Sequence, residues 1–407
     1  MRVAGFSPRS TASVTPPLEG FDFSALRELL GELGADAWLL YDFHGINPSA
    51  TRVLGIKGMG TRRFFVLLPR DGKPIALAHR IELASFDGFP GEVRPYAAWR
   101  ELHEKLRTLV AGKTVAMETS PGDAVPYLDR VPHGVIELIE GFGARVVSSG
   151  TLITRFAARW SASELAGHRR AAEAIAAIAA EALRWAGGEL ARGTEVRETV
   201  VQARVMEAFA RAGLVTDHPP IVGFQANSAN PHYEPKAGAD RRLAAGDVLL
   251  LDLWAGVAAG TVFADQTWMG FAGREPSAEM RTVWEAVRGA RDAAVALLRE
   301  RWKKGEAVTG AALDDVARGV IRAAGFGDYF VHRTGHSIDR DLHGSGPHLD
   351  NFETADERVL IPGVGFSVEP GIYLAGRFGM RTEINVFLAE SGPELSPRQP
   401  QQDLLTV

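Results

Sequence analysis

The sequence predicts an α+β protein with two domains, and three patterns support this prediction. Near the N-terminus, short apolar strands alternate with helical patterns, as in an α/β domain. A capping-box motif, Ser161-Ala-Ser-Glu164, then opens a long Ala-rich helix. From that helix onward, one order of helix, helix, strand and strand occurs twice. We therefore expect a mobile segment at 1–20, an N-terminal α/β domain at 21–155 and a larger C-terminal domain at 156–407.

Apolar patterns predict each element of the N-terminal domain. Strands are expected where short apolar runs occur, at 37–41, 64–68, 74–78 and 114–117. Helices are expected where apolar residues recur at helical spacing, at 23–33, 99–111 and 123–142. Gly34 is placed to end the first helix. Strands and helices that alternate in this way are typical of an α/β domain.

The C-terminal domain contains an internal duplication. Its helices are expected at 163–186, 195–212, 278–300 and 310–324. The strand LAAGDVLLLD matches LIPGVGFSVE, so Asp252 corresponds to Glu369. A Gly-containing turn and a second acid, Asp265 or Glu383, follow 13 and 14 residues later. Because each half buries one face against the other, the duplication predicts a pseudo-twofold domain in which four carboxylates converge.

These carboxylates predict a metal site. Asp252 interrupts an apolar run, VLLLDLW, and an unpaired carboxylate buried there would cost several kcal/mol. Backbone amides could satisfy a single acid of this kind, but the same placement in both halves favours a site. Four converging carboxylates repel one another unless two or three are protonated, whereas two divalent cations cancel their charge. Oxygen-rich ligation with one or two imidazoles suits Mn, Co or Zn.

The composition excludes several classes of site and partner. The chain has no cysteine, so it has no disulfide, thiolate nucleophile or Cys-based zinc site, and it fits a reducing compartment. A formal charge of -5 without a long basic run argues against nucleic acid and anionic lipid. Neither an apolar run of about 18 residues nor the apolar core of a signal peptide occurs. We expect a cytoplasmic protein that binds neither nucleic acid nor membrane.

The segment HRTGHSIDRDLH contains three of the 11 histidines: His332, His336 and His343. They could be metal ligands, acid/base groups or polar loop residues. Since the duplicated strands already supply four acids, a site for two metals needs a single imidazole. Arg381, two residues before Glu383, points to the same face of its strand and could orient that acid.

With these residues in view, 160–395 resembles the pita-bread family of dinuclear metallopeptidases, which includes prolidases, Xaa-Pro aminopeptidases and methionine aminopeptidases. Through segments such as WLLYDFHGINP, 20–150 resembles, more weakly, the creatinase-type N-terminal domain of the prolidase and Xaa-Pro aminopeptidase branch. The resemblance implies a pita-bread fold for the C-terminal domain. It implies hydrolysis of the Xaa-Pro peptide bond, preferably in dipeptides, by a hydroxide that bridges two divalent metals. The alternative within the family is an Xaa-Pro aminopeptidase that accepts longer peptides.

The resemblance also implies the metal ligands. Asp252 would chelate one metal, Asp265 and Glu383 would bridge both, and His336 with Glu369 would complete the other. Mn is the expected metal, with Zn and Co as alternatives. The first acid pair is further apart than is usual in the family, so these roles require the extra residues to stay in the turn.

Further roles follow from the same resemblance. Glu369 would also shuttle a proton, and His343 and His232 would steady the scissile carbonyl and the oxyanion. His332 matches an outer position of the family's site. The family commonly forms dimers in which the N-terminal domain helps to close the neighbouring active site, so a homodimer is expected. A small Xaa-Pro peptide is the expected substrate.

Two residues are proposed for the substrate's charged ends. Arg377, in a turn between two expected ligands, offers bidentate geometry for the carboxylate of a dipeptide. A solvated turn arginine is an equally good interpretation. Asp42, at the end of the AWLLY strand, could reach the substrate's free amine. Two other functions use the same fold: a creatinase-like hydrolase without metals and a binding protein that has lost catalysis. The intact set of carboxylates argues against both.

Overall fold

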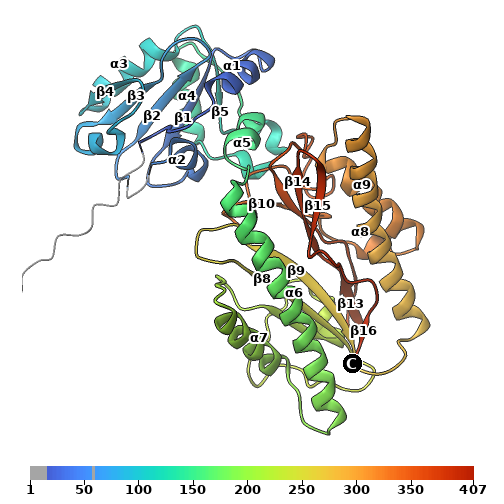
Figure 1. Ribbon diagram of the computed structural model, residues 1–407. Helices are drawn as coiled ribbons and strands as arrows, with labels where there is room; N and C mark the ends of the chain where they lie inside the picture. Colours follow the sequence, from blue (N-terminus) through green and yellow to red (C-terminus); the bar gives the residue numbers. More distant parts are fainter. Residues whose placement is uncertain (1–15, 57–59) are drawn as a thin grey trace, which may run out of the picture. The chain divides into compact units, whose positions relative to one another are not determined.

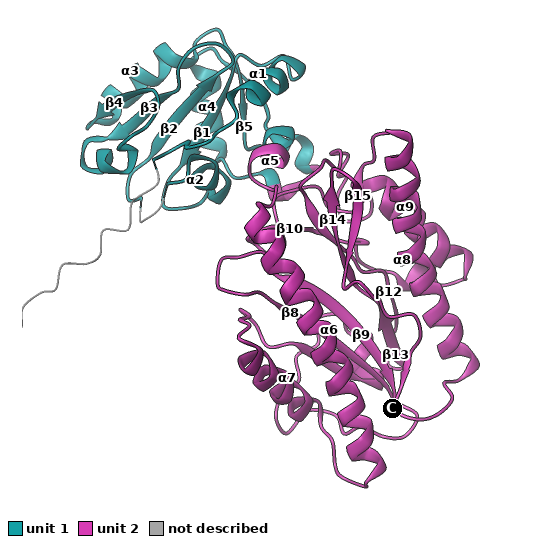
Figure 2. Ribbon diagram, in the orientation of Figure 1, with its two compact units in different colours: residues 1–123, 128–152 teal, residues 124–127, 153–407 magenta. Residues whose placement is uncertain are grey.

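The computed structural model describes residues 16–56 and 60–407 (Figure 1). It divides into two compact units, one of residues up to 123 with 128–152, the other of 124–127 with 153–407 (Figure 2). The expected mobile segment lies outside the described residues up to position 15. Its last part is not free: Leu18 is buried, and its N–H donates to the Leu54 carbonyl over 3.0 Å.

The first unit is built on a mixed six-stranded sheet in the order β4-β3-β2-β1-β5-β6. Its strands are β1 (Ala37–Asp42), β2 (Phe64–Pro69), β3 (Ile75–His79), β4 (Glu92–Tyr96), β5 (Thr114–Met117) and β6 (Arg145–Ser148). Its α-helices are α1 (Phe23–Glu32), α2 (Pro48–Leu54), α3 (Trp99–Val110) and α4 (His133–Gly141), and α5 (Gly150–Phe156) leads into the second unit. Short 3-10 turns are η1 (Arg80–Phe86), η2 (Pro121–Asp123) and η3 (Pro126–Leu128). Apolar residues of α3 and α4 pack on one sheet face, against Leu39 and Tyr41 among others.

The four predicted strands and two of the three predicted helices of this unit are confirmed. The helix predicted at 123–142 is wrong in its first half, because Pro126 and Pro132 interrupt it and only His133–Gly141 is α-helical. The strands β4 and β6 were not predicted. β4 contains Glu92, Arg94 and Pro95 and has no apolar run.

The second unit contains two long helices, each followed by a shorter one. They are α6 (Ala162–Ala191), α7 (Glu198–Ala212), α8 (Ala278–Lys304) and α9 (Gly310–Ala323), as the duplication predicts. The capping box is present: Ser161 Oγ accepts from the Glu164 N–H, and Glu164 accepts from the Ser161 N–H. Figure 1 shows α6 along β8 and β9, and α8 beside the strands of the second half.

Two four-stranded sheets and a separate hairpin complete this unit. One sheet has the order β16-β9-β8-β7, the other β10-β11-β14-β15, and β12 pairs with β13. The strands are β7 (Ile221–Phe224), β8 (Val248–Ala255), β9 (Ala264–Phe271), β10 (Ser337–Ile338), β11 (Gly365–Val368), β12 (Gly371–Leu374), β13 (Phe378–Arg381), β14 (Ile384–Ala389), β15 (Gly392–Ser396) and β16 (Leu405–Thr406). Two 3-10 turns are η4 (Gln225–Ala229) and η5 (Gly327–Tyr329).

The two halves differ in one respect that the sequence did not indicate. In the first half β8 and β9 form one hairpin, whereas in the second half β11 pairs with β14 and the β12–β13 hairpin is inserted between them. Pro370 follows β11 and cannot donate a ladder hydrogen bond, so the regular strand ends there. Among the described residues, no helix is both long and apolar enough to span a membrane.

Candidate metal centre

The β8–β9 hairpin places two acids on one face. Asp252 pairs with Thr267, and Trp254 pairs with Asp265. Because directly opposed residues point to the same side of a sheet and every second residue shares a face, Asp252 and Asp265 lie on one side. The turn between the strands covers 256–263, so the longer spacing is taken up there and does not shift the acids.

In the second half, the two acids lie on either side of a residue pair that joins β11 and β14. Val368 pairs with Ile384, so Glu369, directly after β11, and Glu383, directly before β14, flank that pair. Two bonds join the halves here. The Asp265 N–H donates to Asn385 Oδ1 over 2.9 Å, and the Glu383 N–H donates to the Thr267 carbonyl over 3.3 Å.

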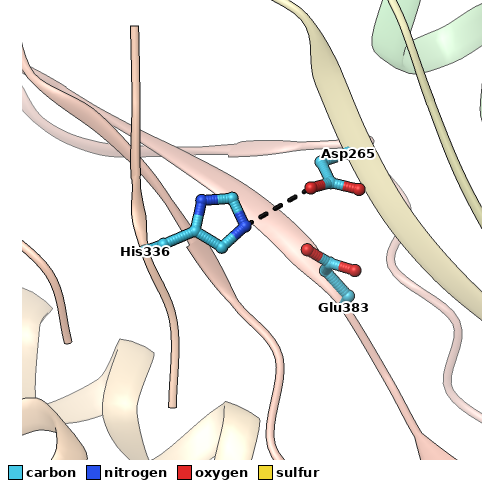
Figure 3. Close-up of side chains that lie close together, drawn as sticks. All are labelled: Asp265, His336 and Glu383. Carbon is cyan, nitrogen blue, oxygen red and sulfur yellow. Dashed lines mark ion pairs between the residues drawn. The ribbon is translucent and has the colours of Figure 1, made fainter. Parts of the chain in front are cut away.

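His336 completes the cluster (Figure 3). Its Nε2 lies 3.4 Å from Asp265 Oδ2 and 3.4 Å from Glu369 Oε1. Its Nδ1 lies 3.1 Å from the Ser337 carbonyl, which can only accept, so Nδ1 carries a proton and Nε2 is directed at the acids. Asp265, His336 and Glu383 each offer a ligand atom, and these atoms lie within 4.8 Å of one another.

The raised pKa values of the clustered acids indicate that their negative charges are not fully compensated by the protein's own cations. The pKa of Asp252 is raised to about 7, chiefly by burial; Arg381 opposes the rise, and the charges of Asp265 and Glu369 contribute to it. Burial also raises the pKa of Asp265, and burial with the neighbouring acids raises that of Glu383 well above its usual range. Without a cation, these acids resist ionisation because each is desolvated beside other negative charges.

A metal ion fits the donor set. Asp252 Oδ1 and Glu383 Oε1 are buried, and neither has a hydrogen-bond partner in the part of the chain that the structure describes. A buried carboxylate oxygen without a partner is costly unless it binds a cation. Four carboxylates and one imidazole supply the ligand types that Mn and Zn accept.

Comparisons with known proteins agree with this centre. Residues 166–390 match the model of Metallopeptidase family M24. The chain belongs to this family. "Probable dipeptidase PepE" of Mycobacterium bovis is 28% identical over 335 residues, which cover 80% of this chain and 81% of that protein. "Xaa-Pro dipeptidase" of Lactobacillus delbrueckii subsp. lactis is 32% identical over 206 residues, 50% of this chain and 51% of that protein.

A solved structure shares the architecture. The crystal structure of dipeptidase PepE from Mycobacterium ulcerans has a TM-score of 0.72 and 26% identity, and the match covers 95% of this chain and 96% of that one. The expected pita-bread fold is thereby confirmed, and the protein is an M24 metallopeptidase.

In this M24 metallopeptidase, Arg381 connects the two halves of the centre. Its guanidinium donates to Asp252 Oδ2 over 2.5 Å, to Thr267 Oγ1 over 2.9 Å and to the Tyr373 hydroxyl over 3.1 Å. Thr267 in turn donates to Glu383 Oε2 over 2.8 Å. Arg381 therefore orients acids from both hairpins, beyond the single acid beside it in sequence.

The other two histidines of the HRTGHSIDRDLH segment lie at different places in the M24 centre. His332 Nε2 lies 2.8 Å from the Tyr373 hydroxyl, so this ring contacts a tyrosine that bonds Arg381 and not a carboxylate of the cluster. His343 is exposed and packs edge-on against His336, with ring centroids 4.3 Å apart. Desolvation beside the cluster lowers the pKa of His343 most, and the neighbouring His336, Arg333 and His232, an exposed residue after η4, lower it further.

Arg377 and Asp42, the two residues expected to bind the substrate, have other partners in the structure. Arg377 is exposed and forms an ion pair with Glu279 of α8. Asp42 belongs to the first unit and accepts hydrogen bonds from the N–H groups of Gly45 and Asn47, at 3.0 and 2.8 Å. The ion pair of Arg377 fits the alternative interpretation, an arginine in a solvated surface turn. Asp42 shapes its own turn.

Two residues near the centre were missed from the sequence. Arg333 is buried, donates to the Tyr127 hydroxyl over 3.0 Å, and is close enough to Glu369 to lower the pKa of that acid. Tyr373 bridges His332 and Arg381 through its hydroxyl. The one available signal for Arg333 was its place beside His332. Tyr373 gave none, because it lies in the inserted hairpin.

Proposed function

We propose that this metallopeptidase hydrolyses the peptide bond that precedes proline, preferably in dipeptides. The observation that carries the proposal is that Asp265, His336 and Glu383 offer ligand atoms within 4.8 Å of one another, with Glu369 3.4 Å from the same imidazole. Among the described residues, the buried Asp252 Oδ1 and Glu383 Oε1 have no hydrogen-bond partner. The relatives named dipeptidase and Xaa-Pro dipeptidase support the substrate class. An Xaa-Pro aminopeptidase that accepts longer peptides is the second candidate.

Two divalent ions, Mn in the first instance and Zn or Co as alternatives, are proposed for the centre. Asp252 would hold one ion, Asp265 and Glu383 both, and His336 with Glu369 the other. Bound there, the ions would polarise the scissile carbonyl and lower the pKa of an attacking water. The four carboxylates balance the charge of two such ions, which supports two ions in preference to one.

The chain's own residues would move protons and bind the peptide. Burial raises the pKa of Glu369, but without metal His336, His332, Arg381 and Arg333 together lower it below its usual range, so we propose that Glu369 is ionised and accepts a proton. Ser367 Oγ donates to Glu369 Oε1 over 3.0 Å and holds it in place. His343 and His232, at the edge of the cluster, are proposed to contact the scissile carbonyl and the oxyanion.

Arg333 is a better candidate than Arg377 for the carboxylate of a dipeptide. Its guanidinium is buried beside the centre and donates a hydrogen bond to a neutral hydroxyl, that of Tyr127. Arg377 already pairs with Glu279 at the surface. A carboxylate brought to a buried guanidinium forms a charge-assisted bond, which favours substrates that end directly after proline.

The test compares an Xaa-Pro dipeptide with the same peptide extended by one or two residues, in the presence of Mn²⁺. We expect faster hydrolysis of the dipeptide, and equal rates on the longer peptide would favour the aminopeptidase. Asp265→Asn keeps the side-chain volume and should abolish turnover while leaving the fold intact by circular dichroism. Full activity in that variant would overturn the proposed centre.

A homodimer is proposed on separate grounds. Phe43 and Trp99 of the first unit are 38% and 54% exposed and line one hollow of about 700 Å³. Exposed aromatic residues that gather in this way are typical of protein interfaces. Sedimentation equilibrium would test the assembly, with Trp99→Ser expected to weaken it. The cytoplasmic location, expected from the absence of a signal-peptide core and of cysteine, stays a prediction.

A further inference from the structure

Arg291 of α8 is a fully buried arginine that lies outside the cluster yet reaches toward it. Its Nη1 donates to Thr382 Oγ1 over 3.0 Å and to the Gln401 carbonyl over 2.8 Å. Its charge partner is the adjacent Asp292, whose side chain is 52% exposed. The guanidinium thus joins a helix, the residue before Glu383 and the C-terminal segment.

The burial of this charge is unfavourable for folding. Burial lowers the pKa of Arg291, which means that the protonated form is desolvated more than it is stabilised by its neighbours. Replacing a buried, incompletely paired charge by an apolar side chain is often neutral or stabilising. Stability alone therefore does not explain an arginine at this position, and the two hydrogen bonds that its Nη1 donates indicate its role.

The bond from Arg291 to Thr382 supports a backbone segment that has only long hydrogen bonds of its own. Thr382 and Glu383 lie between the end of β13 at Arg381 and the start of β14 at Ile384. Their N–H groups donate over 3.4 and 3.3 Å, to Pro370 and Thr267, longer than the usual distance of about 2.9 Å. The side chain of Thr382 is buried, and Arg291 holds it at 3.0 Å.

The second bond leads to the other hairpin. The Gln401 side chain exchanges two hydrogen bonds with the backbone of Met269, at 2.9 and 2.7 Å. Met269 lies on β9, the strand that carries Asp265. Through Gln401 on one side and Thr382 on the other, Arg291 links the backbone that carries Asp265 with the backbone that carries Glu383.

We propose that Arg291 is a positioning residue that holds Asp265 and Glu383, the two acids expected to share both metals, at a fixed separation. This inference rests on the proposed function, since it assumes that these acids bind metal. Partners of metal ligands typically change metal affinity by about 10- to 100-fold when they are removed. Loss of the Arg291 bonds should weaken metal binding by a factor in that range.

The experiment measures Mn²⁺ binding to the purified full chain by the electron paramagnetic resonance signal of free Mn²⁺. Thr382→Val removes the hydroxyl that accepts from Arg291 and keeps the shape, and Thr382→Ser restores a hydroxyl. Arg291→Met removes both bonds. Arg288→Ala is the matched control, because Arg288 lies on the same helix and donates to the Gln402 carbonyl over 3.0 Å, whereas Thr382 accepts from Arg291.

We expect Thr382→Val and Arg291→Met to weaken Mn²⁺ binding by about 10-fold or more, with Thr382→Ser and Arg288→Ala within about twofold of the wild type. Unchanged binding in Thr382→Val, while the wild type binds Mn²⁺, would overturn the positioning role. A wild type that binds no Mn²⁺, Zn²⁺ or Co²⁺ would instead overturn the proposed function. If Arg291→Met fails to fold, Thr382→Val and Thr382→Ser still decide the question.

Discussion

Arg381 and Asp252 form a buried ion pair, with Nη2 2.5 Å from Oδ2, although they lie 129 residues apart and come from different halves of the duplication. Both side chains are at most 10% exposed. The pair leaves Asp252 Oδ1 without a hydrogen-bond partner among the described residues. Arg381 thus neutralises one oxygen of this acid and leaves the other oriented for a cation.

Removing Arg381 should destabilise the protein and weaken metal binding. In Arg381→Met, Asp252 loses its charge partner, so the folded state must either bury an unpaired charge or take up a proton at this acid; breaking a buried ion pair in this way typically costs about 3–5 kcal/mol. Urea unfolding of the metal-free protein measures the loss. The double variant Arg381→Met with Asp252→Asn should recover most of it, because a neutral amide needs neither the charge partner nor the proton. If single and double variants lose equal stability, the ion pair is not the cause.

Metal removal should lower the melting temperature. Ions that bind only the folded state stabilise it by an amount that grows with concentration, about 4 kcal/mol at a thousandfold excess over Kd. Differential scanning calorimetry with chelator and then with added Mn²⁺ checks this. In Asp265→Asn the addition of Mn²⁺ should shift the melting temperature far less. An equal shift in that variant would place the bound ion elsewhere.

The three histidines of the HRTGHSIDRDLH segment should give three different defects. His336→Ala should lose metal affinity, because its Nε2 lies 3.4 Å from both Asp265 and Glu369. His343→Ala should keep the metal and lose turnover. His332→Ala should show a milder loss, matched by Tyr373→Phe, since both changes break the same 2.8 Å hydrogen bond. Metal titration together with kcat separates these outcomes.

Substrate selection should depend on Arg333 and not on Arg377. If Arg333 binds the carboxylate of a dipeptide, Arg333→Met should raise KM by about 10- to 100-fold, the loss of a hydrogen bond to a charged group. Arg377→Met removes an ion pair at the surface and should change KM by less than about twofold. Steady-state kinetics on an Xaa-Pro dipeptide distinguish them. The reverse result would restore Arg377 as the binding residue.

His168 should make stability fall in acid. Burial lowers the pKa of His168 from about 6.5 to about 4, opposed by its hydrogen bond to Phe263 and helped by Arg169. Because the unfolded chain binds this proton first, the stabilisation is complete above pH 6.5 and is lost as pH falls toward 4, on the order of 3 kcal/mol. Urea unfolding across that window should show a shallower decline for His168→Gln. Identical slopes would contradict the assignment.

Local patterns were sufficient to predict much of the fold. Apolar runs predicted β1, β2, β3 and β5, and the capping box at Ser161 predicted the start of α6, because strands and helix ends depend on neighbouring residues. The duplication predicted the four helices of the second unit. β4 escaped prediction because its charged residues and proline form a strand only beside β3.

The sequence by itself determined which acids could form the centre, because their repeated positions on two strands are a property of spacing and period. Arg381 was also indicated by its spacing from Glu383, but the tertiary structure alone decided which other polar side chains lie beside these acids. Arg333 and Tyr373 lie at the centre because of tertiary contacts that no local sequence pattern predicts. Arg377, in contrast, forms an ion pair with Glu279 at the surface. Contacts between distant segments depend on how helices and sheets pack, and packing is not encoded in the spacing of any one segment.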